Sequence, residues 1–173
     1  MLLEWRHQVS MTVDQAISSL AREASKPLQE FKNFLTYCCC DLTGSTLSYF
    51  ATVSPKEDVL TMIGWSKSAM MNCAMMNKPI VYKMSDTGLW GDAVRERKEV
   101  ITNDYQNLVK VTKKGYPTGH VRVSRHMNLP IMEGGHVVLV VGVGNKKEEY
   151  SQPDAKVLRT FMEAAWKHLK TKL

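Results

Sequence analysis

The sequence predicts an α+β domain in which helices flank one antiparallel sheet of roughly five to six strands. Apolar residues recur at intervals of three and four near both ends of the chain, which is typical of amphipathic helices, whereas the middle holds short β-branched runs separated by turn residues. A length of 173 residues, with 44% hydrophobic and 23% charged residues, fits a globular protein with one core. We expect one domain over residues 13–170, an N-terminal extension over 1–12, and a tail or linker over 171–173.

An amphipathic helix is predicted from Val13 to Tyr37, with Pro27 as the point where it kinks or divides. The three consecutive cysteines at 38–40 continue this helix until Thr43 and Gly44 stop it. Neighbouring side chains on a helix point about 100° apart, so these cysteines do not readily share one metal ion. We interpret them as buried small hydrophobic residues.

A β-hairpin and a strand surrounded by short helices are predicted next. In chain order these are the strands 46–53 and 59–65, a helix over 66–76, a strand over 78–84 and a helix over 89–97. Either Thr87 or Asp86 is expected to cap the last of these helices. Its apolar side includes Leu89 and Trp90, whereas Arg95 is expected to face solvent.

A very short strand at 100–102 precedes a long irregular stretch, Asn103–Ser124. Loops of this length inside a compact domain are often functional, so we expect the ligand to meet this loop. Its lysines, Lys110, Lys113 and Lys114, are interpreted as solvated surface.

The clearest hairpin pairs the strands 127–132 and 136–144 around Glu133-Gly134-Gly135, because glycine supplies the positive φ that such turns need. The second strand is rich in valine and should be central. A last helix is predicted from Ser151 nearly to the C-terminus, with Asp154 completing a capping box and Pro153 in its first turn.

Charge and composition limit the partners. The net charge is +6, but acidic residues lie between the Lys and Arg residues, so we expect no nucleic-acid partner. The longest apolar stretch, Val137–Val143, is shorter than the ~20 residues of a membrane-spanning helix, and no signal-peptide pattern is present. Four cysteines, three of them adjacent, do not fit a secreted disulfide framework. We expect a cytoplasmic protein without membrane contact.

Several strings resemble the GAF domain, a relative of PAS domains, in its subgroup attached to bacterial and archaeal histidine kinases. They are Gly88-Leu-Trp-Gly-Asp-Ala-Val-Arg95, Val100-Ile-Thr-Asn-Asp-Tyr105, Lys114-Gly-Tyr-Pro-Thr-Gly-His120, Asn128-Leu-Pro-Ile and Val141-Gly-Val-Gly-Asn-Lys146. The resemblance covers roughly residues 13–170. It implies a ligand pocket on one face of the sheet, with the N- and C-terminal helices on the other face forming a homodimer interface. It also implies a two-component output partner such as a histidine kinase.

The resemblance further implies a non-enzymatic sensor of a small molecule, with haem as the leading ligand for redox or gas sensing. His120 is the first candidate axial ligand of the haem iron and His126 the second, and Cys73 is a candidate covalent tether. Each has a structural alternative: His120 as a partner of backbone groups, His126 at a strand end facing water, and Cys73 in the core.

Trp90, Asp104, Tyr105 and Arg125 are candidate ligand-binding residues, because the segments that frame a GAF cavity combine apolar bulk with a few polar groups. Their alternative is fold stabilisation, with Trp90 filling the core and Asp104 capping the loop.

Two other functions stay open. One is a dimerisation or scaffold domain without a ligand. The other is a thiol-redox enzyme of the free methionine sulfoxide reductase type, whose nucleophilic cysteine lies in a Gly-Val-Cys-Gly string. This sequence has Trp90 in place of that cysteine, and an indole cannot act as a thiolate. The Cys-His pair that attaches bilins is also absent.

Overall fold

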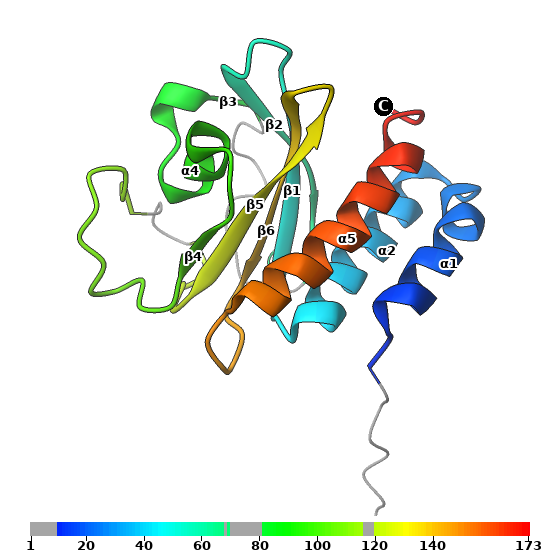
Figure 1. The fold of residues 1–173 in the computed structure, drawn as a ribbon, viewed down its shortest axis with the longest axis horizontal. Coiled ribbons are helices and arrows are strands. Elements are labelled where there is room, and N and C mark those ends of the chain that lie inside the picture. Colours follow the sequence, from blue (N-terminus) through cyan, green and yellow to red (C-terminus); the bar gives the residue numbers. More distant parts are fainter. Residues whose placement is uncertain (1–9, 68, 70–80, 116–119) are drawn as a thin grey trace, which may run out of the picture.

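The computed structural model describes residues 10–67, 69, 81–115 and 120–173. The helix expected over 66–76, and with it Cys73, lies outside the described residues. Within them the strands form a six-stranded antiparallel sheet of order β3-β2-β1-β6-β5-β4, with helices on both faces (Figure 1). The predicted α+β class is therefore confirmed.

The elements have the following bounds. The helices are α1 (Val13–Ala24), α2 (Leu28–Thr43), α4 (Leu89–Glu96) and α5 (Gln152–Leu169), with a 3₁₀ turn at Met84–Asp86. The strands are β1 (Leu47–Val53), β2 (Val59–Trp65), β3 (Val81–Lys83), β4 (Val100–Thr102), β5 (His126–Glu133) and β6 (His136–Gly144). None of the helices in the described part of the chain is long and apolar enough to span a membrane.

Helices α2 and α5 cover one face of the sheet, and α1 packs against both of them (Figure 1). The expected long first helix is divided at Pro27, and the α2 segment ends where Gly44 adopts the left-handed conformation with φ of 66°. Cys38 and Cys39 are completely buried in the core beneath these helices, as predicted, whereas Cys40 is half-buried. The large buried side chains of this core include Leu20, Phe31, Leu35, Phe50, Leu129, Leu158 and Phe161.

Helix α4 and the described parts of the long loop, residues 103–115 and 120–125, lie on the opposite face (Figure 1). The predicted cap of α4 is wrong: Gly88 occupies the N-cap position and no side chain caps the helix. Thr87 is committed elsewhere, because its Oγ1 donates to the Met84 carbonyl at 2.7 Å and accepts from Arg95 Nη1 at 3.0 Å. Backbone and arginine contacts therefore fix the start of α4.

The predicted C-terminal half agrees with the structure. The β5–β6 hairpin turns at Gly134 and Gly135, whose φ values are 57° and 80°. Ser151 and Asp154 form the expected capping box of α5. Alternate residues of β5 face the two layers, so Met127 and Leu129 pack in the core beneath α5 while His126 and Asn128 face α4.

Candidate functional site

One cross-strand row crosses the face of the sheet that α4 covers. Antiparallel partners on adjacent strands carry side chains on the same face. The paired positions place Trp65, Tyr49, Gly142, Asn128 and Val100 in this row, on β2, β1, β6, β5 and β4 respectively. Contacts among these side chains therefore join segments far apart in sequence.

A chain of hydrogen bonds runs along this row and ends at His126. The Tyr49 hydroxyl donates to Asn128 Oδ1 at 2.5 Å, and Asn128 Nδ2 lies 2.9 Å from His126 Nδ1. The Tyr49 ring reaches Asn128 by crossing β6 at Gly142. A Cβ atom at Gly142 would lie 2.0 Å from Tyr49 Cε1 and 2.5 Å from Asn128 Oδ1. Only a residue without a side chain allows this approach.

Burial keeps both ends of this chain uncharged. It raises the pKa of Tyr49 far above its usual range, so the hydroxyl keeps its proton. It also lowers the pKa of His126 to about 4, so the imidazole is neutral at physiological pH. His126 Nε2 is closed to solvent and has no hydrogen-bond partner among the described residues. Such a buried polar atom is uncommon in a folded protein and requires an explanation.

Aromatic rings surround the row. Trp90, on α4, packs edge-on against Tyr49 with ring centroids 5.9 Å apart and against Tyr82 at 5.2 Å. Tyr105, on the long loop, packs edge-on against His126 at 5.8 Å, and the Lys113 ammonium lies 4.8 Å from the centre of the Tyr105 ring. An apolar body beside a few polar groups is typical of a small-molecule site.

Asp92 holds the long loop against α4. Its side chain is only 2% exposed, and Oδ2 accepts from Lys110 at 2.7 Å and Thr112 at 2.6 Å while Oδ1 accepts from Arg95 at 2.6 Å. Burial opposes ionisation of Asp92, but these three donors together lower its pKa. Lys110 also pairs with Glu96 at 2.7 Å. The interpretation of Lys110 as solvated surface is therefore wrong. Arg95 is exposed, as expected, but its guanidinium also donates to Asp92.

Two predicted residues serve the loop itself. Arg125 donates to the carbonyl oxygens of Asn103, Lys146 and Lys147, which fixes the end of the loop beside β6. Asp104 is exposed and accepts from the backbone and side chain of Asn107. These contacts agree with the structural alternative for both residues.

His120 is half-buried in the last part of the loop, near Arg125 in sequence, and its Nδ1 lies 2.7 Å from the carbonyl oxygen of Val121. A carbonyl only accepts, so Nδ1 carries the proton and donates it. Cys73 lies outside the described residues. The structure thus brings Trp90, Tyr105 and His126 to one face, and places Asp104 and Arg125 in contacts within and beside the loop.

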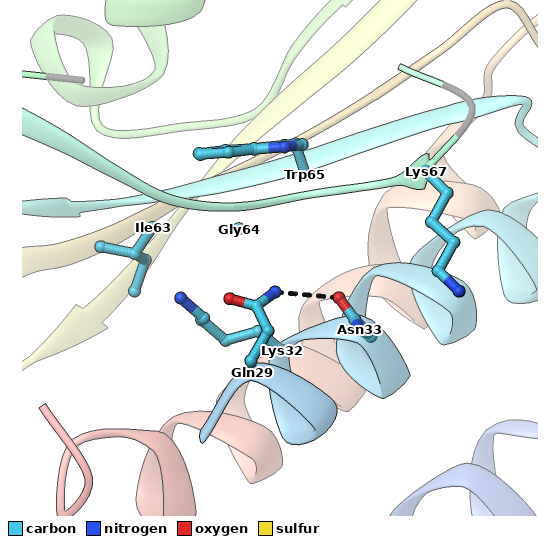
Figure 2. A pocket seen from close by; sticks show the side chains of 7 residues that line it. All are labelled: Gln29, Lys32, Asn33, Ile63, Gly64, Trp65 and Lys67. Atoms are coloured by element: carbon cyan, nitrogen blue, oxygen red, sulfur yellow. Dashed lines mark hydrogen bonds between the residues drawn. The ribbon is translucent and has the colours of Figure 1, made fainter. Parts of the chain in front are cut away.

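Two cavities bounded by described residues lie elsewhere, between α2 and β2. One of about 270 Å³ is lined by Gln29, Lys32, Asn33, Ile63, Gly64, Trp65 and Lys67. Figure 2 shows its α2 residues beneath β2, with the Trp65 ring on the other side of that strand. A second cavity of about 470 Å³ adjoins it near Tyr37 and Cys40. Neither touches α4 or the long loop, and neither contains an unpartnered buried polar atom, so the chemistry favours the α4 face.

Sequence reasoning missed Tyr49, Asn128, Gly142 and Asp92. The available signals were weak. Gly142 interrupts a valine-rich strand, where an isolated glycine often marks close approach of another group. Asn128 is a polar residue between apolar Met127 and Leu129, and all of β5 from His126 to Ile131 is buried.

Comparisons with known proteins agree with this architecture. The GAF domain family model matches residues 25–170. The methyl sulfide methyltransferase-associated sensor of Methanosarcina acetivorans is 41% identical over 158 residues, which is 91% of this chain but 16% of that protein. Two solved structures share the fold at 13% identity. The GAF domain of an Acinetobacter phosphoenolpyruvate-protein phosphotransferase has a TM-score of 0.68, covering 90% of this chain and 91% of its own. The Neisseria meningitidis free methionine-R-sulfoxide reductase has a TM-score of 0.67, covering 93% of this chain and 87% of its own.

Proposed function

Because this chain belongs to the GAF domain family, we propose that it is the non-enzymatic, ligand-sensing input module of a signalling protein. The observation that carries the proposal is the polar chain from Tyr49 through Asn128 to His126, which ends in a buried nitrogen without a partner among the described residues. A buried polar chain with an unsatisfied end makes a fold less stable than apolar residues in its place would. Its presence on an otherwise aromatic face therefore favours ligand recognition. The similarity to a protein named as a sensor supports the same role.

The sheet offers a route from ligand to output. Asn128 faces α4, while its neighbours Met127 and Leu129 pack in the core beneath α5. A ligand that binds better to one arrangement of β5 therefore biases the packing of α1 and α5. In this proposal α1 and α5 form a homodimer interface, and an output module such as a histidine kinase responds to their packing.

We further propose haem as the ligand, with His120 as the axial ligand of the iron. Metal-bound histidines usually donate the N–H of their other ring nitrogen to a carbonyl or carboxylate, and His120 Nδ1 does so to Val121. The lone pair of a neutral imidazole protonated at Nδ1 is on Nε2, the atom that would coordinate iron. Bound haem would supply redox chemistry and a site for small gases. Cys73 remains the proposed covalent tether.

A haem titration monitored by absorbance tests the proposal. We expect a saturable Soret band at one equivalent, shifted by reductant, and its loss or a clear weakening in His120→Ala. His136→Ala is the matched control, because His136 is exposed on β6. If Cys73 is the tether, haem stays with the denatured wild-type chain and is released from Cys73→Ala. Absence of a saturable band would contradict haem. Absence of a thermal shift with any small molecule would contradict ligand sensing and favour the scaffold alternative.

A further inference from the structure

We infer that His126 is a hydrogen-bond donor to the ligand through Nε2–H, oriented by Tyr49 and Asn128, and that the ligand places an uncharged oxygen acceptor there. The inference rests on the proposed function, in that the α4 face must bind a ligand. It also separates the two histidines: His120 has the tautomer of an iron ligand, and His126 has the opposite one.

The direction of the hydrogen bonds follows from the orientation of the Asn128 amide. The buried Tyr49 hydroxyl keeps its proton and donates it to Asn128 Oδ1, the acceptor 2.5 Å away. In the structure the Asn128 amide is oriented with Oδ1 facing Tyr49 and Nδ2 facing His126. An amide NH₂ group only donates, so His126 Nδ1 must accept.

A neutral imidazole that accepts at Nδ1 carries its proton on Nε2. The imidazole is neutral because burial lowers the pKa of His126 to about 4. Nε2–H is therefore a donor without an acceptor in the described part of the chain. As an iron ligand, Nε2 would need its lone pair, which requires reversal of the whole chain as far as the Tyr49 hydroxyl.

The charged groups near His126 do not accept a hydrogen bond from its Nε2–H. Asp92 and Lys110 are the charged groups whose fields reach His126. Both carboxylate oxygens of Asp92 are already occupied, Oδ1 by Arg95 and Oδ2 by Lys110 and Thr112. The long loop contributes the Tyr105 ring, which packs edge-on against the imidazole. Because Nε2 is closed to solvent, a ligand reaches it only when a covering group moves, and we infer that this group is Tyr105.

The same groups define the acceptor. Lys110 and Arg95 are committed to Asp92, and Lys113 donates to the carbonyl oxygens of Gln106 and Leu108. None of these three cations therefore neutralises an anionic ligand group at His126. Moving a carboxylate beside a neutral imidazole in this aromatic environment would cost its hydration without a counter-charge. A carbonyl or other uncharged oxygen accepts the hydrogen bond without that cost. The inferred acceptor is thus an uncharged oxygen beside an apolar or aromatic body, and is not one of the carboxylates that haem itself carries.

Nitrogen-15 NMR of histidine-labelled protein tests the tautomer directly. We expect a protonated Nε2 and an unprotonated Nδ1 for His126 at neutral pH. Asn128→Asp should reverse this assignment, because a carboxylate accepts from Nδ1–H. Asn33→Asp on α2 is the matched control and should leave His126 unchanged. Tyr49→Phe keeps the ring but removes the hydroxyl, and should give a mixture of tautomers. A wild-type His126 protonated at Nδ1 would overturn the inference while the proposed sensing function stood.

The ligand class is tested with two probes of similar size, N-methylacetamide and acetate. We expect N-methylacetamide to shift the Nε2–H proton resonance saturably downfield, at lower concentration in Tyr105→Ala than in the wild type. Acetate should give no saturable shift. Equal responses to both probes, or no saturable response in either protein, would overturn the inference. Failure of the proposed function would instead be seen as the absence of any stabilising ligand.

Discussion

The Tyr49 hydroxyl and the Asn128 side chain meet across an intervening strand, 2.5 Å apart, directly above Gly142. This contact joins β1 to β5 on the face of the sheet that α4 covers. It also orients the amide that contacts His126. The absence of a side chain at Gly142 therefore allows the contact that sets which nitrogen of His126 carries the proton.

Gly142→Ala should disrupt this arrangement. Its Cβ would lie 2.0 Å from the Tyr49 ring, so the ring must move away from Asn128. We expect a loss of about 1–3 kcal/mol in the free energy of unfolding, measured by urea denaturation. Gly144→Ala is the matched control on the same strand and face, because its Cβ would lie 3.6 Å from the nearest atoms. Similar losses in the two variants would contradict the role of the Tyr49–Asn128 contact.

Asp92→Asn should loosen the long loop from α4. The amide keeps the shape of the side chain but loses the ion pairs with Lys110 and Arg95. Those partners are about one-third exposed, so we expect a cost of about 1–2 kcal/mol rather than that of a fully buried pair. Hydrogen exchange should accelerate over residues 105–115. Asp86→Asn is the control, because Asp86 is exposed. If hydrogen exchange over residues 105–115 accelerates equally in Asp86→Asn, Asp92 does not have this role.

The contribution of Asp92 depends on pH in a defined direction. Its pKa is lowered from an ordinary value of 3.8, so the folded chain holds fewer protons than the unfolded chain in acid. The stabilisation is therefore complete above about pH 4 and declines as the pH falls through the lower folded value. We expect the stability difference between wild type and Asp92→Asn to shrink only below about pH 4. A difference that disappears near neutral pH would be inconsistent with this origin.

His126 should also make the protein less stable in acid, and this loss begins at a higher pH than the loss due to Asp92. Its pKa drops from about 6.5 in the unfolded chain to about 4 in the fold, so the unfolded chain binds more protons between these values. Stability is highest above pH 6.5 and declines towards pH 4, by up to about 3 kcal/mol. His126→Gln removes this contribution. The difference in the free energy of unfolding between wild type and His126→Gln should therefore narrow as the pH falls from 6.5 to 4. Parallel pH profiles would show that His126 titrates normally.

Periodicity was sufficient for most of the fold. The spacing of Leu20, Leu28 and Phe31 predicted the N-terminal helices, and Pro27 marked their division, because proline removes a helical hydrogen bond. The start of α4 was predicted incorrectly. Thr87 has the chemistry of a cap, but its hydroxyl bonds to Met84 and Arg95, which is a tertiary contact that local sequence does not specify.

The site was less accessible to sequence reasoning. Trp90 and His126 stood out by residue type, and both lie on the α4 face. Tyr49 and Asn128 are 79 residues apart and meet only through strand register. A shift of one residue in either strand would turn one of them to the opposite face. The pairing of Asp92 with Lys110 likewise depends on how the loop folds back onto α4.

Hydrogen–deuterium exchange before and after one equivalent of haem tests the location of the ligand site most directly. If the ligand binds on the α4 face, amide exchange slows in α4 and in residues 120–128. A weaker effect should follow in α5 through the core beneath β5. Slowing confined to residues 29–37 and 63–67 would place the ligand in the cavities between α2 and β2 and contradict the proposed site.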